Sequence, residues 1–210
     1  MTILAGVFAM VARMKVVVSN DAAAVATNIL ANETLFRSAM TANILATCCY
    51  LVATLLVYEL LRPVNRSVSL LAALFSLLGC AVGALSTVLD LAPFVILRGG
   101  QYTSAFAVEQ SQELTLIFLR LAGQTNNVGL VFFGLHCLLT GYLLFKSGFV
   151  PRGIGALLMF AGIGWLTFLW PPLAGGLFPY TVLPGFIGEL SLTLWLLIKG
   201  VNERAEYQLS

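Results

Sequence analysis

Long apolar runs constrain this chain more than any other feature of its sequence. Five runs reach the roughly 20 residues that a helix needs to cross about 30 Å of hydrocarbon, and a sixth has about half that length. The five are residues 38–61, 67–97, 128–146, 153–170 and 181–199, and the short one is 2–13. The sequence therefore predicts an all-α polytopic membrane protein, a transmembrane bundle of about six helices forming a single domain over residues 1–210.

The composition indicates an apolar outer solvent. Of the 210 residues, 60% are hydrophobic and 10% are charged, whereas a soluble domain carries about a quarter charged residues. The formal net charge of +2 is too small to indicate nucleic acid as a partner. We therefore expect the lipid bilayer to surround the chain. A homo-oligomer or a partner in a membrane complex remains open.

Residues 21–33 predict a short helix at the membrane interface. The segment is rich in alanine, which favours helix formation, and it is too short to cross a membrane. Asn20 or Asp21 stands where an N-cap is needed, because their side-chain oxygens accept hydrogen bonds from the first free N–H groups.

Residues 106–122 predict a second interfacial helix. Three charged side chains on one face would enter hydrocarbon if this segment crossed the membrane. These residues are Glu109, Glu113 and Arg120. Gly123 and the polar residues 124–127 predict a break before the next span, because an unbroken helix over 106–146 would be about 60 Å long.

Basic residues beside the spans predict the orientation. Lysine and arginine stand in the short loops at 62–66 and 146–152 and in the tail at 199–204. Such residues concentrate on the cytoplasmic side of membrane proteins. We therefore predict a multi-pass protein of the cell inner membrane, with both the N- and C-termini in the cytoplasm.

Ionisable residues lie inside three predicted spans. His136, the one histidine of the chain, and Glu189 each stand about 12 Å below the predicted outer end of their spans, and Asp90 lies at a similar depth. An unpaired charge at this depth costs several kcal/mol. We expect the three side chains to face inward and meet, with His136 and Glu189 as a buried hydrogen-bonded pair.

Further polar residues at helical spacing extend this predicted layer. The full set of candidate ligand-binding or proton-linked residues is His136, Glu189, Asp90, Asn43, Tyr50, Arg120 and Asn127. Two alternatives stay open. In the first, these residues serve only to hydrogen-bond the helices to one another. In the second, one histidine and two carboxylates hold a cation, although no ligand spacing repeats locally.

The sequence carries none of the common catalytic motifs. It has no Ser/His/Asp arrangement, HExxH, phosphate loop or haem CxxCH, so we assign no catalytic residue and no metal site and leave the cofactor open. The four cysteines lie in apolar runs without a CxxC and are expected to be buried. A non-enzymatic accessory, sensor or small-ligand-binding module is favoured. A small proton-coupled carrier is the alternative, and an intramembrane enzyme has the least support.

Four stretches of the chain carry a family resemblance. They are SNDAAAVATNILANETLFR, LRPVNRSVSLLAALF, NNVGLVFFGLHCLLTGYLLFKSGFVPR and GFIGELSLTLWLLIKGV. Together they resemble the bacterial integral-membrane family called domain of unknown function 4386, over residues 6–201. Residues 134–137 and 188–190 match family-like positions, whereas the first helix is shorter here than is usual in the family. The resemblance implies a six-helix inner-membrane protein without an assigned activity.

The predicted topology can be tested by labelling single cysteines in intact cells, in a background without the native thiols. Asn65→Cys and Phe149→Cys should react only after permeabilisation, because both positions lie in predicted cytoplasmic loops. Gln101→Cys should react from outside. Labelling of position 65 or 149 in intact cells would contradict the orientation.

Overall fold

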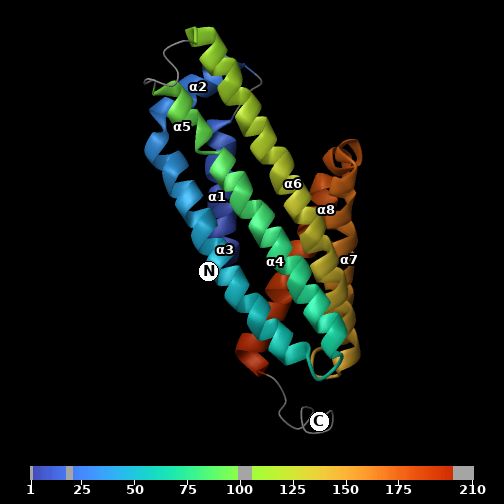
Figure 1. Cartoon of the computed structure of the whole chain (residues 1–210). Helices are drawn as coiled ribbons and strands as arrows, with labels where there is room; N and C mark the ends of the chain where they lie inside the picture. The colour runs from blue at the N-terminus through green and yellow to red at the C-terminus, as the bar shows by residue number, and fades with distance from the viewer. Residues whose placement is uncertain (1, 18–20, 99–105, 201–210) are drawn as a thin grey trace. The chain divides into compact units, whose positions relative to one another are not determined.

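The computed structural model describes residues 2–17, 21–98 and 106–200 (Figure 1). Regular structure in these residues is helical throughout, which confirms the all-α prediction. The helices are α1 (Thr2–Val16), α2 (Ala22–Ala31), α3 (Glu33–Leu61), α4 (Arg66–Leu89), α5 (Ala92–Leu97), α6 (Val108–Ser147), α7 (Arg152–Leu166), the 3-10 helix η1 (Thr167–Leu169) and α8 (Pro171–Lys199).

Four helical stretches among the described residues are long and apolar enough to cross a membrane. They are Glu33–Leu61, Arg66–Leu97, Val108–Ser147 and Arg152–Leu169. They correspond to four of the predicted spans. The other two predicted spans, at 2–13 and 181–199, lie within α1 and α8, and the count of six stays a prediction.

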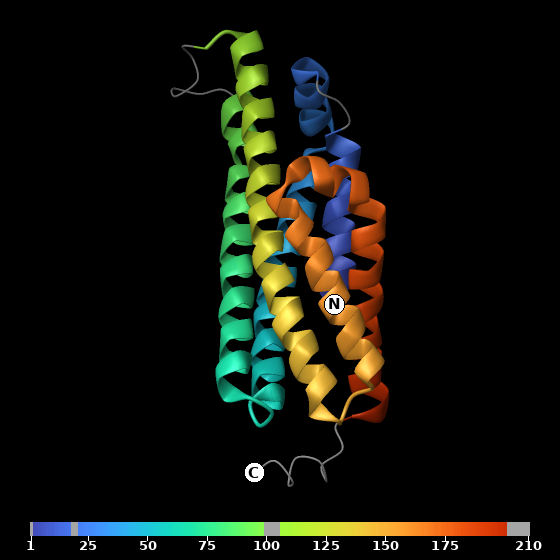
Figure 2. The ribbon, with the colours of Figure 1, turned by 90° about the vertical axis from the view of Figure 1, so that its right-hand side faces the viewer.

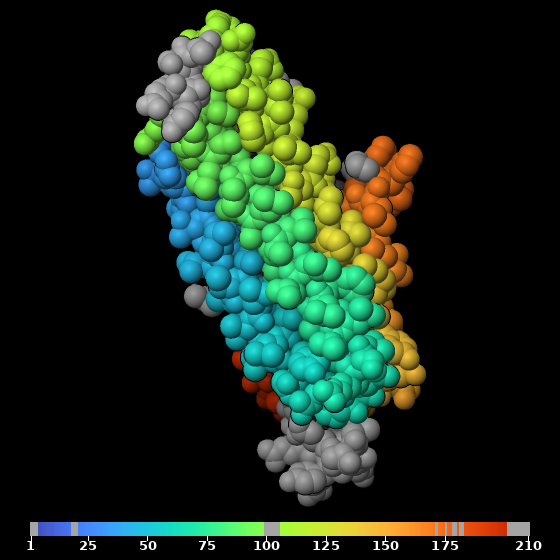
Figure 3. Space-filling view, in the orientation of Figure 1, coloured from blue at the N-terminus to red at the C-terminus, as the bar shows by residue number. Residues whose placement is uncertain are grey.

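Large apolar side chains cover the outward faces of these helices. On α4, which reaches the surface seen in Figure 3, Leu74, Leu78 and Leu85 are 48%, 47% and 53% exposed. Extended apolar surface of this kind is unfavourable in water and is typical of helices that contact lipid. Cys48 and Cys49 share such a surface on α3, so their predicted burial is wrong, whereas the other two cysteines are buried.

The predicted break at 123–127 is wrong, because α6 is one continuous helix. Glycine inside a helix costs only about 1 kcal/mol relative to alanine, and this cost does not end the helix. The polar side chains that follow are accommodated locally. Gln124 and Asn126 are exposed, and the Thr125 hydroxyl donates to the carbonyl of Leu121 at 2.9 Å.

The predicted run at 67–97 is divided into two helices. α4 ends at Leu89 and α5 begins at Ala92, with Pro93 in its first turn. Proline lacks an N–H group and fits the first turn of a helix, where no intrahelical partner exists. Asp90 therefore lies at a junction between two helices. Prolines also begin α8, at Pro171.

The chain forms two compact units. Unit 1 contains residues 1–50 and 81–126, and unit 2 contains residues 51–80 and 127–210. The helices α3, α4 and α6 each contribute residues to both units. The single domain over 1–210 stays a prediction. The core of unit 1 consists of Val16, Ala22, Val25, Ile29, Phe36, Phe94, Leu116 and Leu119. The core of unit 2 consists of Leu61, Leu143, Leu144, Val150, Ile154 and Leu158.

Glycines bring α6 and α7 into backbone contact in unit 2, where Figure 2 shows the two helices side by side. A Cβ atom on Gly155 would lie 2.7 Å from the carbonyl oxygen of Gly141, and one on Gly162 would lie 2.7 Å from that of Gly134. No side chain fits at these distances. Small residues that allow such close approach are a common basis of helix packing in membranes.

Gly155→Ala should destabilise the protein by about 2 kcal/mol, because its methyl group would meet backbone atoms that cannot move aside. Gly153→Ala on the same helix is the matched control. A Cβ there meets nothing within 4 Å, so its stability should stay the same or rise slightly through helix propensity. Thermal unfolding in detergent measures both, and equal losses would contradict the close contact.

Candidate functional site

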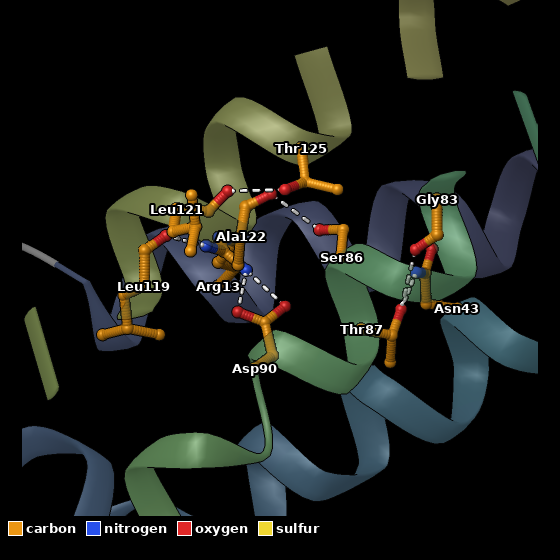
Figure 4. Close-up of polar contacts among 10 residues, drawn as sticks. All are labelled: Arg13, Asn43, Gly83, Ser86, Thr87, Asp90, Leu119, Leu121, Ala122 and Thr125. Carbon is orange, nitrogen blue, oxygen red and sulfur yellow. Dashed lines mark hydrogen bonds and ion pairs between the residues drawn. The ribbon is translucent and has the colours of Figure 1, made fainter. Parts of the chain in front are cut away.

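An ion pair connects α1 to the junction between α4 and α5 in unit 1 (Figure 4). Nη1 of Arg13 contacts both carboxylate oxygens of Asp90, and Nη2 donates to the carbonyl oxygen of Leu119 at 2.9 Å. The Asp90 side chain is 12% exposed and that of Arg13 is 31% exposed. The break in the helix thus positions a carboxylate whose charge is balanced by an arginine from another helix.

Hydroxyl and amide groups surround this ion pair in Figure 4. Ser86 donates from Oγ to the carbonyl of Ala122 at 2.8 Å, and Asn43 donates from Nδ2 to Oγ1 of Thr87 at 2.8 Å. Carbonyl oxygens of α6 therefore accept hydrogen bonds from side chains of both α1 and α4. The arrangement binds the helices of unit 1 together through groups that each have a partner.

His136 lies in unit 2, on α6, and is 7% exposed. Its Nδ1 atom is 3.0 Å from the carbonyl oxygen of Ala72 on α4. Because a carbonyl can only accept, Nδ1 carries the proton, and Nε2 is the acceptor nitrogen of the neutral ring. This hydrogen bond gives a physical reason for a histidine within an apolar run.

Other polar groups of unit 2 differ in whether they have a partner. Thr54 and Ser76 share a hydrogen bond of 2.7 Å between their hydroxyls. By contrast, Oγ1 of Thr140 and Nε1 of Trp195 are buried without a hydrogen-bond partner among the described residues. A buried unsatisfied group costs about 1–3 kcal/mol. Such groups are places where a bound water or polar ligand would be stabilising.

Glu189 is a half-buried residue of α8. Its carboxyl group lies close enough to the Cys137 thiol on α6 for an electrostatic interaction. Among the described side chains, no hydrogen bond or ion pair forms to this carboxyl group, and none joins it to His136. The pairing of His136 with Glu189 therefore stays a prediction.

The predicted site residues fall into both units. Asp90 and Asn43 belong to the polar cluster of unit 1. Tyr50 is half-buried on α3 and also belongs to unit 1. Arg120 is exposed on α6. Asn127 is half-buried in unit 2, which also contains His136 and Glu189. The predicted single layer, which joins Asp90 to the two residues of unit 2, stays a prediction.

Sequence reasoning missed Arg13 as the partner of Asp90. The predicted span at 2–13 ended at this residue, so its side chain was expected at the start of a loop. In the structure α1 continues to Val16. The sequence signal was the pair Ala12 and Val16, which are four residues apart on either side of Arg13 and share one face of a helix. In the structure they are 1% and 0% exposed. This spacing turns the last helical turn of α1, and Arg13 with it, toward the core of unit 1.

Within the described residues, no three side chains of histidine, cysteine, aspartate or glutamate gather as a group that could hold a metal ion.

Fold and polar clusters together define a class of helical protein in which apolar helices enclose charged and hydrogen-bonding groups. The chain belongs to the family described as "Domain of unknown function (DUF4386)", whose sequence profile matches residues 1–200. The family resemblance is thereby confirmed. A relative from Archaeoglobus fulgidus, described as an uncharacterized protein, is 31% identical over 146 residues, which are 68% of this chain and 72% of the relative. No solved structure matches this chain.

Asp90→Leu should destabilise the protein by about 3 kcal/mol, because it leaves the Arg13 charge without its partner between apolar helices. The double variant Arg13→Leu with Asp90→Leu should recover part of this loss. Unfolding in a denaturing detergent series measures both variants.

Glu59→Leu is the control for the loss of an ion pair at the surface. Glu59 on α3 pairs with Arg62, just after the end of that helix, at 3.1 Å, and both side chains are about half exposed. The loss of this pair should therefore cost less than about 1 kcal/mol. If the double variant Arg13→Leu with Asp90→Leu loses as much stability as its two single variants combined, Arg13 and Asp90 are not coupled.

Proposed function

We propose that this chain is a non-enzymatic integral membrane protein, a sensor or small-ligand-binding module whose binding residues lie in unit 2. The observation that carries the proposal is the hydroxyl of Thr140. It is buried without a hydrogen-bond partner among the described residues, one helical turn after His136. A group of this kind is stabilised when a polar ligand or a bound water molecule forms a hydrogen bond with it.

The polar groups of unit 2 provide both donors and acceptors for such a ligand. The Trp195 indole N–H is a donor without a partner among the described residues. The Glu189 carboxyl group is an acceptor that receives no hydrogen bond from a described side chain. His136 can act in either sense, because Nδ1 donates to the carbonyl of Ala72 and Nε2 of the neutral ring is an acceptor. Ionisable side chains within membrane-spanning helices are rare and usually functional.

An enzymatic role has less support. The thiol of Cys137 follows His136 directly in the sequence, but it is 2% exposed. Neighbouring residues on a helix also point to different faces, so His136 is poorly placed to activate this thiol. A proton-coupled carrier is the second candidate, and the titratable groups of His136 and Glu189 within one unit favour it.

Fluorescence of Trp195 tests the proposal when the other two tryptophans, Trp165 and Trp170, are replaced by phenylalanine. In detergent, its emission should change with pH, because protonation of His136 or Glu189 would change the field at the indole. Glu189→Gln keeps the size and hydrogen-bonding capacity of the side chain and should reduce the change. Glu59→Gln, at the exposed surface, should leave it as it is.

An emission that stays constant with pH would contradict a proton-linked role for both residues, and an emission that responds equally in Glu189→Gln would contradict such a role for Glu189. The same proteins in vesicles that enclose a pH-sensitive dye distinguish the two candidates. A sensor or binding module should not dissipate an imposed pH gradient, whereas a carrier should do so in a way that depends on Glu189.

A further inference from the structure

Two arginines of unit 1 share one carboxylate. Nε of Arg37 and Nη2 of Arg98 each lie 2.7 Å from Oε1 of Glu33, and Nη2 of Arg98 is also 2.8 Å from Oε2. Two positive charges face one negative charge, so the cluster keeps a surplus of one positive charge. Because both arginines contact the same oxygen atom, their guanidinium groups are close enough to contact a single phosphate group.

This arginine pair stands where two candidate membrane spans end. Glu33 is the first residue of the stretch Glu33–Leu61, and Arg98 directly follows the stretch Arg66–Leu97. The ends of such stretches lie at the boundary between hydrocarbon and water, which is the level of the lipid phosphates. The cluster is thus at the depth at which a phospholipid carries its charge.

The arginines are held in place and remain accessible. The guanidinium group of Arg37 lies 4.1 Å from the centre of the Phe94 ring, in a cation–π contact, and Phe94 is itself 4% exposed. The side chains of Arg37 and Arg98 are 46% and 60% exposed. Guanidinium groups oriented in advance bind phosphate with little loss of side-chain freedom, and they bind it through charged hydrogen bonds.

Exposed apolar side chains precede Arg98 along the chain, on α5 and at the residue before it. Val95 is 60% exposed and Leu91 is 43% exposed. Val95 precedes Arg98 by three residues, so the two share one side of the helix. A cationic group that follows an apolar face along one helix matches a lipid, whose phosphate is joined to an acyl chain.

We propose that Arg37 and Arg98 bind the headgroup phosphate of an anionic phospholipid, whose acyl chain lies along Val95 and Leu91. The single surplus positive charge of the cluster matches the single negative charge of a lipid such as phosphatidylglycerol. The site shares with the proposed function only the insertion of the helices in a membrane, and it requires no ligand in unit 2.

Thermal unfolding of the full chain in dodecyl maltoside micelles tests the site. Dihexanoyl phosphatidylglycerol should raise Tm by about 3 °C more than dihexanoyl phosphatidylcholine at equal concentration, because a ligand that binds the folded state stabilises it. The difference between the two lipids should disappear in the double variant Arg37→Gln with Arg98→Gln. Arg98→Gln alone should lose about half of it, and this variant decides the test if the double variant does not fold.

Arg62→Gln is the matched control. Arg62 is an arginine at the other end of α3 that is 52% exposed and paired with Glu59, and its loss should leave the lipid difference unchanged. An equal loss in this variant would show a general charge effect and overturn the site. An equal rise in Tm with inorganic phosphate would show a site for soluble anions and overturn the assignment to a lipid. A lipid difference that persists in Arg98→Gln and in the double variant would also overturn it.

Discussion

Backbone N–H and C=O groups that lie in apolar surroundings have no water to bond, and this constraint governs the architecture of the chain. A helix satisfies these groups within its own segment, which explains why regular structure in the described residues is helical. Several hydroxyl groups follow the same rule, although the buried hydroxyls of Thr115 and Thr140 have no partner among the described residues. Thr47 donates to the carbonyl of Asn43 at 2.9 Å, and Thr193 donates to that of Glu189 at 2.8 Å. Polar side chains thus find acceptors one turn back on their own helix.

The buried ionisable groups are not satisfied by acceptors one turn back on their own helix, and the two units differ in how they treat them. In unit 1, Asp90 meets Arg13, and the arginine uses a second nitrogen on the carbonyl of Leu119. In unit 2, His136 has a carbonyl partner, whereas Glu189 accepts no hydrogen bond from a described side chain. Satisfied polar groups fix helices to one another, and unsatisfied ones respond to what reaches them. Unit 1 also contains a buried hydroxyl without a partner among the described residues, that of Thr115. The proposed binding residues belong to unit 2 because the hydroxyl of Thr140 lies there one helical turn from His136.

The accuracy of sequence-based prediction followed the range of the interactions involved. Local signals performed well: Pro63 follows the end of α3 at Leu61, and Asp21 caps α2 by accepting from the N–H groups of Ala23 and Ala24. Gly123 misled because a single glycine weakens a helix without ending it. The partner of Asp90 was out of reach, because Arg13 lies 77 residues away and no periodic pattern links two such positions.

The glycine contacts between α6 and α7 also bear on the order in which the chain folds. The two helices are joined by residues 148–151, where Gly148 has a φ of +75°, a conformation that favours glycine. Their contacts connect positions close in sequence, so little chain entropy is lost when the hairpin closes. The ion pair of Arg13 closes a far longer loop. We therefore expect the α6–α7 hairpin to form early in folding. It would then present a preformed surface on which α8 can pack.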